Sequence, residues 1–209
     1  SLSAQAYLMM PLNIETYFEN EVDERKVQES FNFNLIREVL PLVTLFTAEE
    51  TARLETAHKT FLANMSTLSD LEYRKEMERL GVDLSWKSSQ IEGNTYSLLE
   101  TERLLKEKET AQGKTKEEAV MLLNHKDALD FILDCPDYLK TLSVRRLEDI
   151  HSILTKELGV GNGIRKRRVG ITGTNYRPLD NEFQIREALE DTCQLINGKD
   201  NVFEKALLA

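Results

Sequence analysis

This sequence of 209 residues has few cysteines, no long apolar run and no excess of positive charge. Cys135 and Cys193 are too few for a disulfide framework, so we expect a reducing, cytoplasmic setting. No apolar run approaches the ~18 residues that a membrane span needs, and no secretory signal peptide is visible. The net charge of −9 disfavours a protein that binds nucleic acid over its whole surface, because phosphate contacts need Lys and Arg.

Signals for metal binding and nucleotide loops are also weak. None of the three histidines stands in a His-Glu-x-x-His setting, and neither cysteine in a Cys-x-x-Cys setting, so no metal site is predicted. The stretch Gly159-Val-Gly-Asn-Gly163 lacks the Lys-Ser/Thr ending of a phosphate-binding loop. We interpret it as the end of a helix that runs into a loop.

Repeated helix-start signals indicate a mainly α-helical fold. Four segments fit the Ser/Thr-x-x-Glu capping box, in which the hydroxyl accepts one free backbone N–H and the Glu carboxylate accepts another. They are Thr47 with Glu50, Ser69 with Glu72, Ser97 with Glu100, and Thr115 with Glu118. Apolar residues at helical spacing also predict a helix from Leu147 to Leu158 and a later one that ends near Gly198.

One stretch departs from the helical pattern. Val169 and Ile171 alternate with other residues, residues 172–175 supply turn chemistry, and Tyr176 stands where a return strand would begin. This pattern predicts one β-hairpin. We expect the basic run Arg165–Arg168 to be solvated on that hairpin, with an anion contact or an exposed edge for a partner as the alternatives.

The segment from Ser88 to Asn94 is the most informative. Ser88 and Glu92 are four residues apart and therefore share one face of a helix, which Gly93 is placed to end as the residue just past the cap. A carboxylate near a helix C-terminus meets the negative end of the helix dipole, which is mildly unfavourable. This placement predicts a cationic partner for Glu92; an ordinary exposed Glu is the alternative.

The same segment resembles the inhibitory motif of the Fic (filamentation induced by cAMP) family of protein adenylyltransferases, Ser/Thr-x-x-x-Glu-Gly/Asn, through Ser88, Glu92 and Gly93. Further segments resemble other parts of the family, in the family's order. They are Asn124-His-x-x-Ala128, the helix Leu147–Leu154, and the flap pieces Gly163-Ile-Arg165, Val169–Gly173 and Tyr176-Arg-Pro178. The resemblance covers about residues 80–209 and implies a Fic-type helical bundle with one β-hairpin flap.

The family's signature, His-Pro-Phe-x-Asp/Glu-Gly-Asn-Gly/Lys-Arg, is absent from the sequence. The helix that precedes it is expected near Val202–Ala209, so we expect a Fic bundle that is incomplete at its C-terminus. We expect three segments. The first is an N-terminal helical region (1–80), to which the resemblance does not extend; the other two are the inhibitory helix with bundle helices (81–139) and the N-terminal part of the Fic core with its flap (140–209).

The resemblance implies an autoinhibited enzyme that transfers AMP from ATP, with Mg²⁺, to a hydroxyl of a protein substrate. The base, the metal ligand and the γ-phosphate ligand belong to the signature, so no catalytic or metal residue is expected within these 209 residues, which alone should be inactive. Glu92 would pair with the signature Arg and block productive ATP binding, while Ser88 and Gly93 shape its helix. The flap residues that would hold the protein substrate by strand addition are Ile164, Arg165, Val169, Ile171, Gly173 and Tyr176.

Two other functions stay open. One is a non-catalytic regulatory or interaction fragment whose inhibitory helix acts on a separate catalytic chain. The other is a nucleic-acid-binding helical domain that uses the basic hairpin, which the acidic balance disfavours. No membrane partner is expected, and homo-oligomer formation is left open. Without the signature helix, apolar side chains should be exposed on the helices that contain Leu122, Leu154 and Leu189.

Overall fold

A computed structural model describes residue 19 and residues 30–171 and 176–209. The chain divides into two compact units, which are described separately here. Unit 1 comprises Ser1–Thr60, Leu142–Val144 and Ile164–Ala209, and unit 2 comprises Phe61–Thr141 and Arg145–Gly163. The three segments expected from the resemblance, 1–80, 81–139 and 140–209, stay predictions, because the two units are defined by compactness alone.

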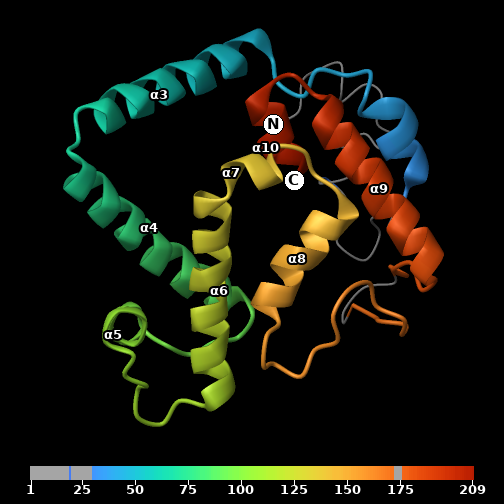
Figure 1. The fold of residues 1–209 in the computed structure, drawn as a ribbon. Helices are drawn as coiled ribbons and strands as arrows, with labels where there is room; N and C mark the ends of the chain where they lie inside the picture. The colour runs from blue at the N-terminus through green and yellow to red at the C-terminus, as the bar shows by residue number, and fades with distance from the viewer. Residues whose placement is uncertain (1–18, 20–29, 172–175) are drawn as a thin grey trace. The chain divides into compact units, whose positions relative to one another are not determined.

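The described residues are mainly helical, as predicted, and form no strand (Figure 1). The elements are the π-helix η2 (Leu35–Val39) and the helices α3 (Ala48–Ser66), α4 (Asp70–Ile91), α5 (Leu98–Glu107), α6 (Lys116–Asp134), α7 (Pro136–Leu139), α8 (Val144–Leu154), α9 (Glu182–Gly198) and α10 (Val202–Leu208). None of these described helices combines the length and the apolar character that crossing a bilayer requires.

The predicted hairpin is not seen. Residues 164–171 and 176–178 carry no strand, and one isolated parallel bridge joins Arg177 to Ser30. The predicted turn, residues 172–175 with Gly173 among them, lies outside the described residues.

All four predicted capping boxes are confirmed. In each box the Glu amide donates to the Ser or Thr hydroxyl, at 3.1 to 3.4 Å, and the Ser or Thr amide donates to the Glu carboxylate, at 2.7 to 2.9 Å. Because these contacts satisfy backbone N–H groups that lack a partner inside the helix, they fix where α3, α4, α5 and α6 begin.

Unit 2 is built on α4, α5 and α6, with α4 and α6 packed side by side (Figure 1). Its core contains the buried side chains of Tyr96, Leu104, Ala119 and Leu122. Gly81 lies where α4 approaches α6: a Cβ added there would stand 3.4 Å from the Lys126 side chain. This distance is ordinary van der Waals contact, so Gly81 marks the approach of α4 to α6 without being required by a clash.

Helix α8 ends earlier than predicted, at Leu154 rather than Leu158. The side-chain amide of Asn124, on α6, donates to the carbonyl oxygens of Leu154 (3.1 Å) and Lys156 (2.8 Å). These carbonyls are thereby occupied by a neighbouring helix, and Glu157 takes a positive φ of 60° that interrupts the helical backbone. A contact between distant parts of the sequence thus decides where this helix ends.

Unit 1 holds η2 against α9 and α9 against α10. Val43 and Leu45 form a small buried cluster on which Leu40, Phe46 and Leu208 pack. Beside this cluster, Lys199 Nζ lies 3.5 Å from Glu204 Oε2, with both side chains buried. Lys199 also donates to the Val43 carbonyl (2.8 Å), and the Leu45 amide donates to Glu204 Oε1 (2.7 Å). The segment before α3 is therefore tied to the C-terminal helices.

Candidate functional site

The C-terminal end of α4 has the geometry that its sequence predicts. Glu92 is the cap residue, and Gly93 follows with a φ of +88°, the left-handed conformation that favours glycine. The Gly93 amide donates to the Gln90 carbonyl (3.1 Å) and the Asn94 amide to the Ser89 carbonyl (2.9 Å). Together these bonds form a Schellman motif, which satisfies the last carbonyls of the helix and fixes the direction in which the chain leaves it.

A groove of about 220 Å³ lies among α4, α6 and α8, within unit 2. We call it the α4–α6–α8 groove. Its apolar lining includes Leu84, Leu129, Ile132, Ile150 and Leu154. Its polar lining consists of Ser85, Ser88 and His125, so the structure brings the predicted inhibitory residue Ser88 to the same groove as the histidine of the Asn-His-x-x-Ala segment.

Glu92 acts electrostatically on this groove. Burial lowers the pKa of the half-buried His125 below its ordinary value, and the nearby Glu92 carboxylate opposes that shift. Glu92 itself is exposed, and it forms no salt bridge with any described residue. Its negative charge therefore lies close to His125 and is open to a cation from elsewhere.

Two serine hydroxyls beside Ser88 lack hydrogen-bond partners among the described residues. They are Ser85 Oγ and Ser89 Oγ, and both residues are almost completely buried, although Ser85 is one of the residues around the groove. An unpaired buried hydroxyl is costly. The sequence does not predict these unpaired hydroxyls, because a helix-face pattern shows which side a serine occupies and not whether a partner is present.

The segment Asn124–Ala128 has a structural place beside the groove. The Asn124 side chain holds the end of α8, as described above, and Ala128 is buried against the groove. His151, on α8, buries its Nδ1 with no hydrogen-bond partner among the residues that the structure describes. Neither His125 nor His151 belongs to a metal cluster, since no group of three or more His, Cys, Asp or Glu within the described ranges could hold an ion.

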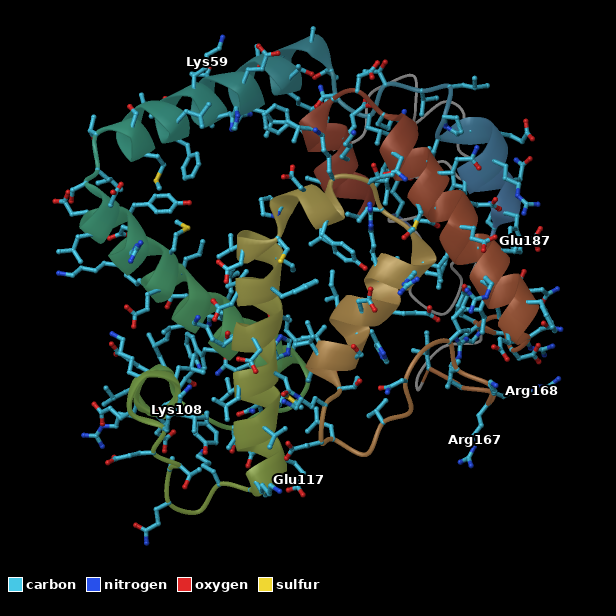
Figure 2. The ribbon with its side chains drawn as sticks, viewed as in Figure 1. Lys59, Lys108, Glu117, Arg167, Arg168 and Glu187 are labelled. Atoms are coloured by element: carbon cyan, nitrogen blue, oxygen red, sulfur yellow. The ribbon has the colours of Figure 1, made fainter. Side chains whose placement is uncertain are left out.

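The predicted flap residues lie in unit 1, apart from Gly173, which falls outside the described residues. Val169 and Ile171 are exposed, whereas Ile164 and Tyr176 are half-buried. Figure 2 shows Arg167 and Arg168 extending away from the ribbon. Arg168 Nε lies 2.6 Å from Asp180 Oδ2, and both side chains remain accessible.

The expectation that the whole run Arg165–Arg168 is solvated is wrong for Arg165. Its guanidinium donates to the Leu179 carbonyl, and its Nε is buried with no partner among the described residues. A basic run in a sequence cannot show which member turns inward, because the carbonyl that receives Arg165 lies fourteen positions further along the chain.

The expectation of exposed apolar side chains concerns the helices that contain Leu122, Leu154 and Leu189. Ile132 and Leu133 are exposed on α6, the first of these helices, and Phe183 is exposed on α9, the last. Leu122 has no exposed surface, because Tyr96 and Leu104 pack on it. Leu154 is half-buried and lines the groove, and Leu189 is half-buried within unit 1. The apolar surface that α6 offers to the groove comes instead from Leu129 and Ile132.

No protein-family model, no curated protein and no solved structure matches this chain.

Proposed function

We propose that this chain is the regulatory part of an autoinhibited Fic-type protein adenylyltransferase, with Glu92 as its inhibitory residue. The reaction would transfer AMP from ATP to a hydroxyl of a protein substrate. The proposal rests on the order of the four Fic-like segments in the sequence and on the environment of Glu92.

One observation carries the proposal. Glu92 caps α4 beside Gly93, its charge acts on His125, and no described residue pairs with it. A carboxylate at the negative end of a helix dipole is unfavourable unless a cation offsets it. Glu92 would therefore bind an arginine that otherwise holds the γ-phosphate of ATP, and the enzyme would stay inactive while that pair persists.

The α4–α6–α8 groove would receive the element that carries this arginine. Its lining is apolar around Leu129, Ile132 and Ile150, which suits the apolar face of a helix. The polar lining residues Ser88 and His125 lie in the same groove, so an incoming element could also bring polar side chains to it.

In this proposal, no residue of this chain takes part in the chemical step of AMP transfer. Mg²⁺ would assist ATP chemistry, but no cluster of acidic or histidine side chains among the described residues suits it. In this proposal, Glu92 binds the arginine and keeps it from the γ-phosphate of ATP. Residues near Ile164–Tyr176 would bind the protein substrate. The exposed Val169 and Ile171 would contact that substrate.

The test uses the full-length protein that the gene encodes. Labelled ATP and Mg²⁺ are supplied to the wild type and to Glu92→Gly, and incorporation of AMP into protein is measured. We expect Glu92→Gly to raise incorporation strongly, because the carboxylate that sequesters the arginine is gone. Glu109→Gly, which changes an exposed Glu in the loop after α5, is the matched control and should stay at the wild-type rate.

Equal incorporation by the wild type and Glu92→Gly would overturn the inhibitory role. The 209-residue chain alone should incorporate none. If the full-length protein also incorporates none, but suppresses a separate Fic enzyme in a Glu92-dependent manner, the regulatory-fragment function replaces the proposal.

A further inference from the structure

The loop that follows Glu92 is fastened at successive residues to α4, to α6 and to the segment that precedes α6. The Asn94 side-chain amide donates to the Glu118 carbonyl (2.8 Å), and its Oδ1 accepts the Tyr96 amide (2.9 Å). The Trp86 indole donates to the Tyr96 carbonyl (2.9 Å), and Lys114 donates to the Thr95 carbonyl (2.6 Å). The chain just past the helix end therefore has little freedom to move independently of these neighbours.

The Glu118 carboxylate serves two segments at once. Its Oε2 accepts the Thr115 amide (2.9 Å) and hydroxyl (3.2 Å), which completes the capping box of α6. Its Oε1 accepts the Thr95 amide (2.8 Å) and hydroxyl (2.5 Å), twenty-three positions earlier in the chain. These donors lower the pKa of Glu118 to about 2, so the carboxylate is ionised at physiological pH.

We infer that Glu118 is a positioning residue for Glu92: its second oxygen, through Thr95, holds the end of α4 so that the Glu92 carboxylate stays close to His125. This inference rests on the proposed function. Thr95 is three residues beyond Glu92, and Asn94 and Gly93 between them form the Schellman motif. Releasing Thr95 would loosen that motif and let Glu92 move away from His125 while α6 remains folded.

The substitution Glu118→Gln separates the two contacts. A glutamine has one carbonyl oxygen, which still suffices for the capping box. The amino group of the glutamine then faces the amide and hydroxyl of Thr95. Because an amino group donates and cannot accept, the hydrogen bond from the Thr95 amide is lost. Glu72→Gln is the matched control, since Glu72 completes the capping box of α4 through Ser69 and has no hydrogen bond to a second segment.

Hydrogen exchange of the 209-residue chain tests the geometry. We expect the amides of Asn94, Thr95 and Tyr96 to exchange roughly tenfold faster in Glu118→Gln, as loss of one charge-assisted hydrogen bond predicts. The same amides should be unchanged in Glu72→Gln. Thr95→Val, which removes the hydroxyl and keeps the amide, should give a smaller increase. Unchanged exchange in Glu118→Gln, or equal increases in Glu118→Gln and Glu72→Gln, would overturn the inference.

AMP incorporation by the full-length protein tests the consequence. Glu118→Gln should raise incorporation in the wild-type background and add nothing in the Glu92→Gly background, because its effect passes through Glu92. A merely structural effect would change the rate by the same factor in both backgrounds, which would overturn the positioning role. If Glu92→Gly itself leaves the rate of AMP incorporation unchanged, the proposed function fails. If Glu92→Gly raises the rate but Glu118→Gln does not, the positioning role alone is refuted.

Discussion

Replacing Lys199 with Met would leave the Glu204 carboxylate buried without its cation. The two side chains are 10% and 9% exposed, and their charged atoms lie 3.5 Å apart. Removing one partner of such a buried pair typically costs about 3–5 kcal/mol, because the remaining charge is desolvated and uncompensated. With a urea dependence of about 2 kcal/mol per molar, the unfolding midpoint should fall by about 1.5–2.5 M.

A double-mutant cycle isolates the pair. Glu204→Gln keeps an oxygen that can accept the Leu45 amide but removes the charge, so this single change should also destabilise. Lys199→Met combined with Glu204→Gln leaves no unpaired charge, and it should be more stable than the sum of the two single losses predicts. Unfolding in urea is followed by far-ultraviolet circular dichroism for all four chains.

The matched control is Lys106→Met, which breaks the exposed pair with Glu102 (2.8 Å) on α5 and should leave the midpoint nearly unchanged. The reasoning would be refuted if both single changes at the buried pair left the midpoint as little altered as Lys106→Met does. Strict additivity in the double mutant would equally show that the two charges do not depend on each other.

Two further predictions concern the end of α4. Gly93→Ala should lower the free energy of unfolding by about 1–2 kcal/mol because its φ is +88°; no neighbour lies within 4 Å of the added Cβ, so a clash would not contribute. Gly198→Ala, at a position without a positive φ, is the control and should not destabilise. Equal effects of the two substitutions would show that the backbone angle is not the cause. Glu92→Gln should lower the pKa of His125 further, because the negative charge of Glu92, which opposes the effect of desolvation, is removed. NMR titration of the imidazole checks this, with Glu109→Gln as the control, and an unchanged pKa would mean that Glu92 faces elsewhere.

Local chemistry explains why much of the fold could be predicted. A capping box joins residues three positions apart, and the Gly93 stop depends on the backbone angle of one residue, so both can be identified in a sequence. The end of α8 could not be predicted, because it depends on Asn124, thirty positions before the Leu154 carbonyl that it binds. Sequence periodicity contains no information on such a contact.

The flap shows the limit of a period-two pattern. Val169 and Ile171 are 49% and 54% exposed, so their alternation gives no apolar face that burial would stabilise. In the described residues of this stretch no ladder of strand pairing forms, and Arg165 turns inward against an expectation based on its charged neighbours. Which residue is solvated depends on tertiary contacts that the local sequence does not specify.

In the candidate site, too, local features can be predicted from the sequence, whereas contacts between distant segments cannot. Ser88, Glu92 and Gly93 were assigned from spacing and resemblance, and their arrangement at the end of α4 follows from helix geometry. The contact between Glu118 and Thr95 is not predicted by the sequence, because the capping box already accounts for the carboxylate. A carboxylate nevertheless has two oxygens and can serve two segments. The unpaired Ser85 hydroxyl likewise becomes visible only in three dimensions.

The charge of Glu92 is the centre of this account, and Glu92→Gln in the full-length protein tests it most directly. Glutamine keeps the size of the side chain and removes only the negative charge. If Glu92 inhibits by pairing with an arginine, AMP incorporation by Glu92→Gln should rise to nearly the level of Glu92→Gly. Incorporation that stays at the wild-type level in Glu92→Gln, while Glu92→Gly is active, would show that the charge of Glu92 is not what holds the enzyme inactive.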